Sequence, residues 1–267
     1  MTRIYDYHLH STYSFDAVST MEEVVKSGIE KGICELAFTD HIEFHDNTLS
    51  ELSESLKREY AEFLALKEKY GHKISLKFGM EAGQLLYKPH ETDILCGLLP
   101  YDFIIFSLHC IRYGVDYHDM DYTGLDISEE AGKYLNELKE LVDTFSDFSV
   151  LGHCDYLARY VKIKNLDFDF DSLKYEFEPI FKALIKKGKG IELNTSGFRT
   201  SHGAAMPSKE ILGVYRECGG EIITIGSDAH NKNDIGANFH KGVALLKEAG
   251  FNKITIFNKK TPEFVNI

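Results

Sequence analysis

The chain has 267 residues, of which 42 are acidic and 30 are basic, so its formal net charge is −12 at pH 7. Hydrophobic residues make up 43% and charged residues 27% of the chain, which is typical of a globular protein and excludes disordered, collagen-like and coiled-coil sequences. Nucleic acids and anionic membranes require a basic protein face, so we expect neither as a partner. The twelve histidines are the feature of the composition that needs an explanation.

The cysteines and the N-terminal segment indicate the cellular compartment in which the protein is expected. Five cysteines, at positions 34, 96, 110, 154 and 218, include no C-x-x-C pair, which is typical of reduced thiols. The first residues, MTRIYDYHLH, lack the basic-then-apolar pattern of a signal peptide. No segment approaches the ~18 apolar residues of a membrane span. These features predict a cytoplasmic protein, and they predict no particular oligomeric state.

Apolar segments alternate with amphipathic ones along the whole chain, which is the pattern of repeated strand–helix units. Strands are predicted near 5–9, 35–39, 73–80, 103–108, 149–152, 190–194 and 221–226, with a further short strand at 253–257. Helices are predicted near 20–31, 50–70, 91–97, 128–145, 169–187, 207–218 and 233–249. Because the chain has no Pro/Gly/Ser-rich linker and no dinucleotide-type glycine loop, we expect one domain over residues 1–267 with its strands arranged as a barrel.

The histidines fall where a barrel places its functional groups, at the carboxyl ends of the strands. Six histidines and three carboxylates follow predicted strands, namely His8, His10, Asp16, His41, Glu81, His109, His153, Asp228 and His230. In His8-x-His10 both side chains point to the same face of the strand, so both imidazoles can bind one ion. Imidazole together with carboxylate oxygen suits Zn²⁺, Mn²⁺ or Fe²⁺. Nine ligands exceed the needs of one ion, so they predict three divalent ions bridged by Glu81 or Asp228.

These motifs resemble those of the polymerase and histidinol phosphatase (PHP) superfamily. The resemblance covers nearly the whole chain and rests on Asp6-Tyr7-His8-Leu9-His10 with Asp16, Thr39-Asp40-His41, Glu81, Ser107-Leu108-His109, Gly152-His153-Cys154-Asp155 and Ser227-Asp228-Ala229-His230. Within the superfamily, the segments Phe78-Gly79-Met80-Glu81 and Glu192-Leu193-Asn194-Thr195 are most similar to the monofunctional histidinol-phosphate phosphatases. The resemblance implies an α/β fold, a distorted (β/α)7 barrel of the TIM-like PHP type, with a trinuclear metal centre.

The resemblance also implies how the ligands are shared and what they do. The first ion would be held by His8, His10, Glu81 and Asp228, the second by Glu81, His109 and His153, and the third by Asp16, His41 and His230. The implied reaction is hydrolysis of L-histidinol phosphate in histidine biosynthesis, by attack of a hydroxide that bridges two ions. Glu81, Asp228 and His230 are expected to be catalytic, with Asp228 or a metal-bound water protonating the leaving group.

Phosphate recognition points to arginine. Arg159 and Arg199 lie in the loops after the fifth and sixth predicted strands, and a guanidinium can bind phosphate through two hydrogen bonds. We expect these arginines to bind the phosphate, the alternative being that each is a solvated surface charge. Ser227 and His202 are further candidates for the same anion.

The loop 111–126 is rich in tyrosine and aspartate. This composition suits a cationic amino alcohol that carries an imidazole, through carboxylate pairing and stacking. Tyr117 in this loop, and Glu43 just beyond His41, are expected to contact that half of the substrate. The alternative is a solvated acidic loop.

Other functions fit parts of the pattern. A PHP enzyme could act instead on another small phosphomonoester such as a nucleotide or phosphotyrosine, whereas an exonuclease is disfavoured because no basic stripe could follow a nucleic-acid strand. An amidohydrolase also opens with H-x-H, but that family commonly bridges its metals with a carbamylated lysine where this chain offers Glu81. A degenerate, non-catalytic PHP domain would lack ligands, and none of the nine is missing.

Overall fold

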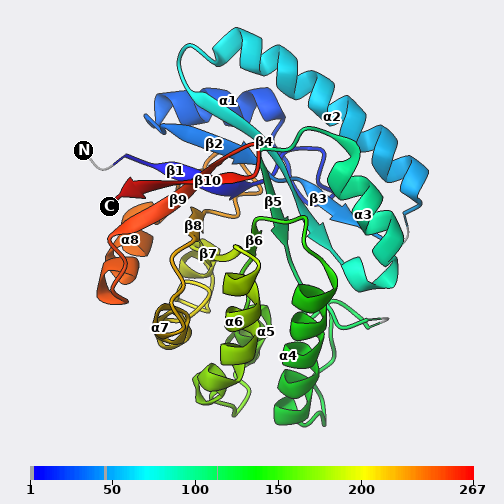
Figure 1. The fold of residues 1–267 in the computed structure, drawn as a ribbon, viewed down its shortest axis with the longest axis vertical. Helices are drawn as coiled ribbons and strands as arrows, with labels where there is room; N and C mark the ends of the chain where they lie inside the picture. The colour runs from blue at the N-terminus through cyan, green and yellow to red at the C-terminus, as the bar shows by residue number, and fades with distance from the viewer. Residues whose placement is uncertain (1–2, 45–46, 113) are drawn as a thin grey trace.

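The computed structural model describes residues 3–44, 47–112 and 114–267. Its main sheet follows the path β1 (Tyr5–Leu9), β2 (Glu35–Phe38), β4 (Ser75–Gly83), β5 (Phe103–Phe106), β6 (Val150–Leu151), β7 (Gly190–Asn194) and β8 (Ile223–Gly226), with all neighbours parallel. The two ends of this path meet, because the Asp228 amide donates to the His8 carbonyl at 2.7 Å and the His10 amide donates to the Ala229 carbonyl at 2.9 Å. These bonds nearly close the sheet, which confirms the predicted barrel of seven strands (Figure 1).

Helices surround the strands, with α1 and α2 on one side and α4 to α7 on the other in Figure 1. They are α1 (Met21–Glu30), α2 (Leu49–Tyr70), α3 (Pro89–Leu98), α4 (Ile127–Thr144), α5 (Tyr156–Ile163), α6 (Glu178–Lys186), α7 (Lys209–Glu217) and α8 (Phe239–Glu248). Three short 3-10 helices are η1 (Leu85–Tyr87), η2 (Phe170–Phe177) and η3 (Ser196–Arg199). Within the described ranges, no helix combines the length and apolar character needed to cross a membrane.

The core lies between the barrel and its helices. Strands such as β5, with the sequence FIIF, are buried at every position because helices cover the outside and side chains fill the inside. Aromatic side chains pack against one another in the core. The Tyr7 and Phe103 rings, for example, contact edge to face with their centres 5.0 Å apart. This dense packing holds the strand ends in fixed positions.

Local chemistry sets the helix starts. Thr20 and Glu23 form the predicted capping box of α1, each side chain accepting a hydrogen bond from the other's backbone amide. The helix predicted over 169–187 is divided in two, and α6 begins at Glu178 with Pro179 in its first turn, a position that needs no amide donor. The helix predicted from 233 begins only at Phe239, after Asn238 adopts a left-handed conformation.

The structure adds elements that the sequence pattern did not predict, and it extends the short strand predicted at 253–257 into a hairpin. β3 (His41–Glu43) pairs with β4 in parallel and places His41 opposite Glu81. α5 follows directly after His153 and Asp155. At the end of the chain, β9 (Lys253–Asn258) and β10 (Thr261–Asn266) form an antiparallel hairpin. Of these, β3 and α5 shape the functional site.

Candidate metal centre

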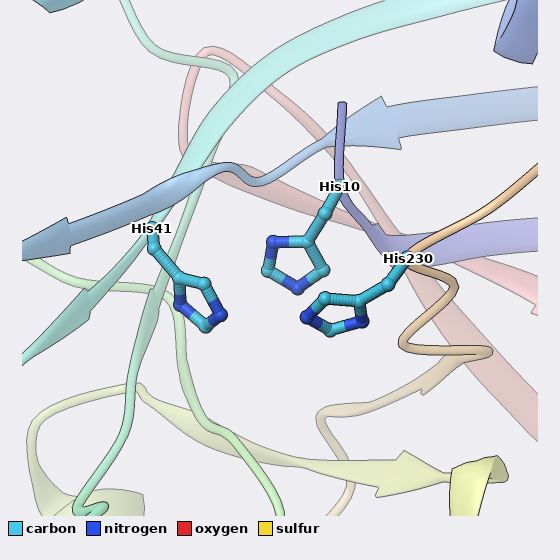
Figure 2. A group of neighbouring side chains, drawn as sticks. All are labelled: His10, His41 and His230. Atoms are coloured by element: carbon cyan, nitrogen blue, oxygen red, sulfur yellow. The ribbon is translucent and has the colours of Figure 1, made fainter. Parts of the chain in front are cut away.

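All nine predicted ligands meet at one end of the barrel, around a pocket of about 730 Å³. Figure 2 shows three of the imidazoles, those of His10, His41 and His230, pointing toward one another from three separate segments. The centre of the His10 ring lies 4.3 Å from that of His41 and 4.2 Å from that of His230. Among the residues that the structure describes, four groups could each hold an ion, namely His10–His41–His230, His8–Glu81–His153, His8–His10–Asp228 and His41–Glu43–His109.

Glu81 lies at the centre of the cluster, and its two carboxylate oxygens face different imidazoles. Oε2 lies 3.1 Å from Nε2 of His8 and 3.0 Å from Nδ1 of His41. Oε1 lies 2.9 Å from Nε2 of His153 and 3.4 Å from Nε2 of His109. A carboxylate that presents one oxygen to each of two ligand groups is suited to bridge two ions.

The outer edge of the cluster is formed by Asp16 and His230. Asp16 Oδ2 lies 3.1 Å from His230 Nε2, and Asp16 Oδ1 lies 3.7 Å from His41 Nε2. Asp228 connects this edge to the interior, because its Oδ1 lies 3.5 Å from His230 Nδ1 and 3.4 Å from His10 Nε2. The structure therefore brings together the three ligands that the motifs assign to a third ion.

Several ligand atoms are buried without a hydrogen-bond partner. They are His8 Nε2, His10 Nε2, His41 Nδ1 and Glu81 Oε2. Each buried polar atom left in this state costs about 1–3 kcal/mol, so a fold that gathers four of them requires a common partner. Imidazole nitrogens and carboxylate oxygens are donors for Zn²⁺, Mn²⁺ and Fe²⁺. The donor set thus fits divalent metal ions.

Two carboxylates outside the main cluster orient its imidazoles. Glu192 on β7 accepts a hydrogen bond from His8 Nδ1 at 2.7 Å, and Glu43 on β3 accepts one from His109 Nδ1 at 2.8 Å. When the imidazole is neutral, each bond keeps the proton on Nδ1 and leaves Nε2 free to bind a metal. Sequence reasoning gave Glu192 no role, although a glutamate within the apolar strand β7 is a buried charge that needs a partner.

Electrostatics favour the metal-binding forms of His10 and Glu81. Burial lowers the pKa of His10, and the neighbouring imidazoles of His41 and His230 lower it further, so this ring is neutral. Burial raises the pKa of Glu81, but the imidazoles of His8 and His41 outweigh that effect and keep the pKa well below its ordinary range. A neutral imidazole and an ionised carboxylate are the forms that bind metals.

The backbone at the end of β8 is strained in order to place Asp228. This residue has a left-handed φ of 52°, which is uncommon outside glycine. Two residues earlier, Gly226 makes room for the neighbouring strands, because a Cβ atom there would lie 2.2 Å from Glu192 Oε1 and 2.3 Å from His8 Cβ. Strain of this kind, held by surrounding structure, is typical of functional sites.

Comparison with known proteins identifies the family. Residues 6–196 match the family model described as the PHP domain. The chain belongs to the PHP family. The histidinol-phosphatase of Lactococcus lactis is 30% identical over 95% of this chain and 94% of its own length. The probable histidinol-phosphatase of Thermotoga maritima is 28% identical over 96% of each chain.

Solved structures show the same PHP barrel. The crystal structure of histidinol phosphate phosphatase from Lactococcus lactis, complexed with Zn, L-histidinol and phosphate, matches with a TM-score of 0.81 and 26% identity over 98% of this chain and 99% of that one. A putative histidinol phosphatase from Listeria monocytogenes shares the fold with a TM-score of 0.73 and 17% identity, over 89% of this chain and 99% of its own. The family resemblance and the fold predicted from the motifs are therefore confirmed.

Both candidate phosphate-binding arginines line the PHP pocket, but their surroundings differ. Arg159 on α5 makes no hydrogen bond or ion pair with the described part of the chain, so its guanidinium is available to a ligand. Arg199 on η3 donates from Nη2 to the carbonyls of Ser227 and Asp228, at 2.7 and 3.2 Å. Its Nη1 is buried and has no partner. Arg199 thus supports the strained ligand segment while keeping one donor free.

Three residues predicted to bind substrate, Tyr117, Ser227 and His202, are not among the residues that line the pocket. Tyr117 is fully buried, its amide donates to the His109 carbonyl, and its ring packs edge to face against Tyr134. The Ser227 hydroxyl donates to Asp6 Oδ2. His202 lines a separate cavity together with residues of α5.

Two other predictions for the organic half of the substrate are refined. Glu43 lines the pocket, but its carboxylate is engaged by His109. The loop 111–126 does reach the pocket, through Asp116, His118 and Asp119, while its Tyr113 lies outside the described residues. The carboxylates predicted in this loop thus reach the pocket as Asp116 and Asp119, whereas the ring of Tyr117 is buried.

Proposed function

We propose that this PHP protein is a metal-dependent phosphomonoesterase that hydrolyses L-histidinol phosphate to L-histidinol and phosphate. The observation that carries the proposal is Glu81, which presents one oxygen to His8 and His41 and the other to His109 and His153. The similarity to histidinol-phosphatases over nearly the full length of the chain supports the choice of substrate.

The ligands would be shared among three divalent ions as the motifs imply. One ion would be held by His8, His10, Glu81 and Asp228, a second by Glu81, His109 and His153, and a third by Asp16, His41 and His230. When bound, such ions make water nucleophilic at neutral pH and draw charge from the phosphate oxygens. Because the ligands extend from His8 to His230, we treat residues 1–267 as one functional domain.

The residues around the ligands supply the remaining chemistry of phosphate hydrolysis. Arg159 would pair with the phosphate dianion, and Arg199, which lines the same pocket, would be a second donor. Asp228 Oδ2 accepts hydrogen bonds from Ser196 Oγ at 3.2 Å and Asn194 Nδ2 at 3.3 Å. As a carboxylate at this edge, Asp228 would take the proton lost by the attacking water and return it to the leaving oxygen.

Another part of the pocket lining suits the organic half of the substrate. Asp116 is half-buried and lines the pocket, as does the exposed Asp119 from the same loop. Asp116 Oδ1 accepts a hydrogen bond from the His118 amide at 2.7 Å, which fixes the carboxylate in place. L-Histidinol carries an ammonium group and an imidazole that can also be cationic, so an acidic wall favours it over an anionic or neutral leaving group.

The proposal is tested by comparing substrates on one metal-loaded preparation. Phosphate release is measured with L-histidinol phosphate, with a nucleoside monophosphate, with phosphotyrosine and with p-nitrophenyl phosphate. We expect kcat/KM for L-histidinol phosphate to exceed the others by at least about a hundredfold, the scale of two well-placed charged contacts. Comparable values for all four substrates would refute the specific assignment and leave a general PHP phosphoesterase.

A further inference from the structure

Phe15 is an exposed aromatic side chain at the mouth of the metal pocket. It is 82% exposed, and it lines the pocket beside its chain neighbour Asp16. Its ring stacks on His41, with the ring centres 5.5 Å apart and the planes at 26°. A large apolar side chain left in water at a binding cleft is a surface on which a ligand can be buried favourably.

The loop that carries Phe15 is tied to the barrel on both sides of the residue. Before it, the amide and hydroxyl of Ser14 both donate to Asp40 Oδ1, at 3.1 and 2.6 Å. After it, the Val18 amide donates to the His230 carbonyl at 3.0 Å. The exposed ring is therefore held in position by the same loop that carries a metal ligand, and little entropy is lost when a ligand stacks on it.

The other residues that line the pocket indicate which kind of ligand Phe15 can bind. The same pocket is also lined by the carboxylates of Asp116 and Asp119. These charges attract a cation, and the face of an aromatic ring favours both planar rings and cations. A planar, cationic group such as imidazolium meets both requirements at once.

We propose that Phe15 is a specificity-determining residue whose exposed ring stacks with the planar ring of the substrate's organic half. The inference rests on the proposed function, because it concerns how that substrate is selected. While the phosphate occupies the metal end of the pocket, the ring of the substrate lies against Phe15 at the mouth. The aromatic contact then distinguishes ring-bearing phosphomonoesters from small amino-alcohol phosphates that lack a ring.

The test compares two substrates across matched variants. L-Histidinol phosphate has the ring and 2-aminoethyl phosphate keeps the ammonium group without it, and kcat/KM is measured for both with the metal-loaded wild type, F15A, F15Y and V18A. Val18 is the control, since it is 76% exposed on the same loop and does not line the pocket. We expect F15A to lose about three- to tenfold on L-histidinol phosphate alone, and F15Y and V18A to match the wild type.

A binding measurement separates stacking from an effect on the metals. Calorimetric titration of the metal-loaded proteins with L-histidinol should show a three- to tenfold weaker Kd for F15A, with unchanged metal content. Equal losses on both substrates, or no loss on either, would overturn the inference. If the wild type does not hydrolyse L-histidinol phosphate, the proposed function fails instead, and that result is distinct from an unselective F15A variant.

Discussion

Glu192 provides a sharp test of how the fold prepares its metal ligands. Its Oε1 accepts a hydrogen bond from His8 Nδ1 at 2.7 Å, and its Oε2 accepts one from the His153 amide at 3.0 Å, with all of these groups buried. In the variant E192Q, one of the two oxygens becomes an NH₂ group. If that group faces His8, the imidazole must accept there and carry its proton on Nε2, the atom that faces Glu81. If it faces His153 instead, two donors are forced together.

Either arrangement weakens metal binding by a predictable amount. Loss of a partner that orients a ligating histidine reduces metal affinity by about 10- to 100-fold, or about 1.4–2.7 kcal/mol at 1.36 kcal/mol per tenfold. This agrees with the ~1.5–3 kcal/mol net value of a hydrogen bond to a charged group. The assay is chelator competition at pH 7.5, with the bound metal counted by mass spectrometry.

The matched control is E35Q. Glu35 is also a buried glutamate on a barrel strand, but it lies at the start of β2, and its carboxylate contacts Tyr7, Ser75 and Lys77, none of which is a metal ligand. E35Q should lower the melting temperature and leave metal affinity unchanged. A folded E192Q protein that binds metal as tightly as the wild type would refute the proposed role of Glu192 in setting the His8 tautomer.

Three further predictions follow from the site and its surroundings. Burial lowers the pKa of His41, but Glu81 and Asp16 outweigh this effect and raise the pKa to about 10 in the metal-free protein, so metal binding must release a proton. Apparent metal affinity, measured by chelator competition at pH 6, 7.5 and 9, should therefore rise with pH, and a flat profile would contradict this. In steady-state kinetics, R159A should lower kcat/KM for the phosphomonoester by about ten- to hundredfold, because Arg159 lines the pocket, while the variant Y117F of a buried residue should match the wild type. A larger loss in Y117F than in R159A would contradict the role assigned to Arg159. Burial raises the pKa of Glu59 well above its ordinary value, as does the adjacent carboxyl of Asp40, so in the folded state Glu59 keeps a proton that it loses in the unfolded state. The contribution of Glu59 to stability should fall as pH rises above about 4.3, so the wild type should lose stability relative to E59Q between pH 5 and pH 8 in urea unfolding.

The sequence predicted the barrel and the ligand cluster because both follow from periodic, local signals. Strand ends are marked by the change from apolar runs to polar residues, and in a parallel barrel all of these ends lie at one rim. His8, Glu81 and Asp228, which are far apart in the chain, could therefore be placed together without a structure. Their contacts in the structure, such as 3.1 Å between His8 Nε2 and Glu81 Oε2, agree with that placement.

The substrate-binding wall was less predictable because loop conformation depends on tertiary contacts. In the loop 111–126, Tyr117 is buried, with its amide bonded to the His109 carbonyl, while Asp116 lines the pocket. The role of Glu192 was equally hidden, because its partner His8 lies 184 positions away. Phe15 carried no sequence signal at all, since an aromatic residue in a short loop is more often buried than exposed.

The most direct test of the account is phosphate release from L-histidinol phosphate by one preparation that is stripped of metal and then titrated with Zn²⁺ or Mn²⁺. The account predicts that the stripped protein stays folded by circular dichroism and is inactive, and that activity rises to a plateau as about three ions bind per chain. Full activity in the stripped protein would contradict it. So would a chain loaded with three ions that releases no phosphate from this substrate.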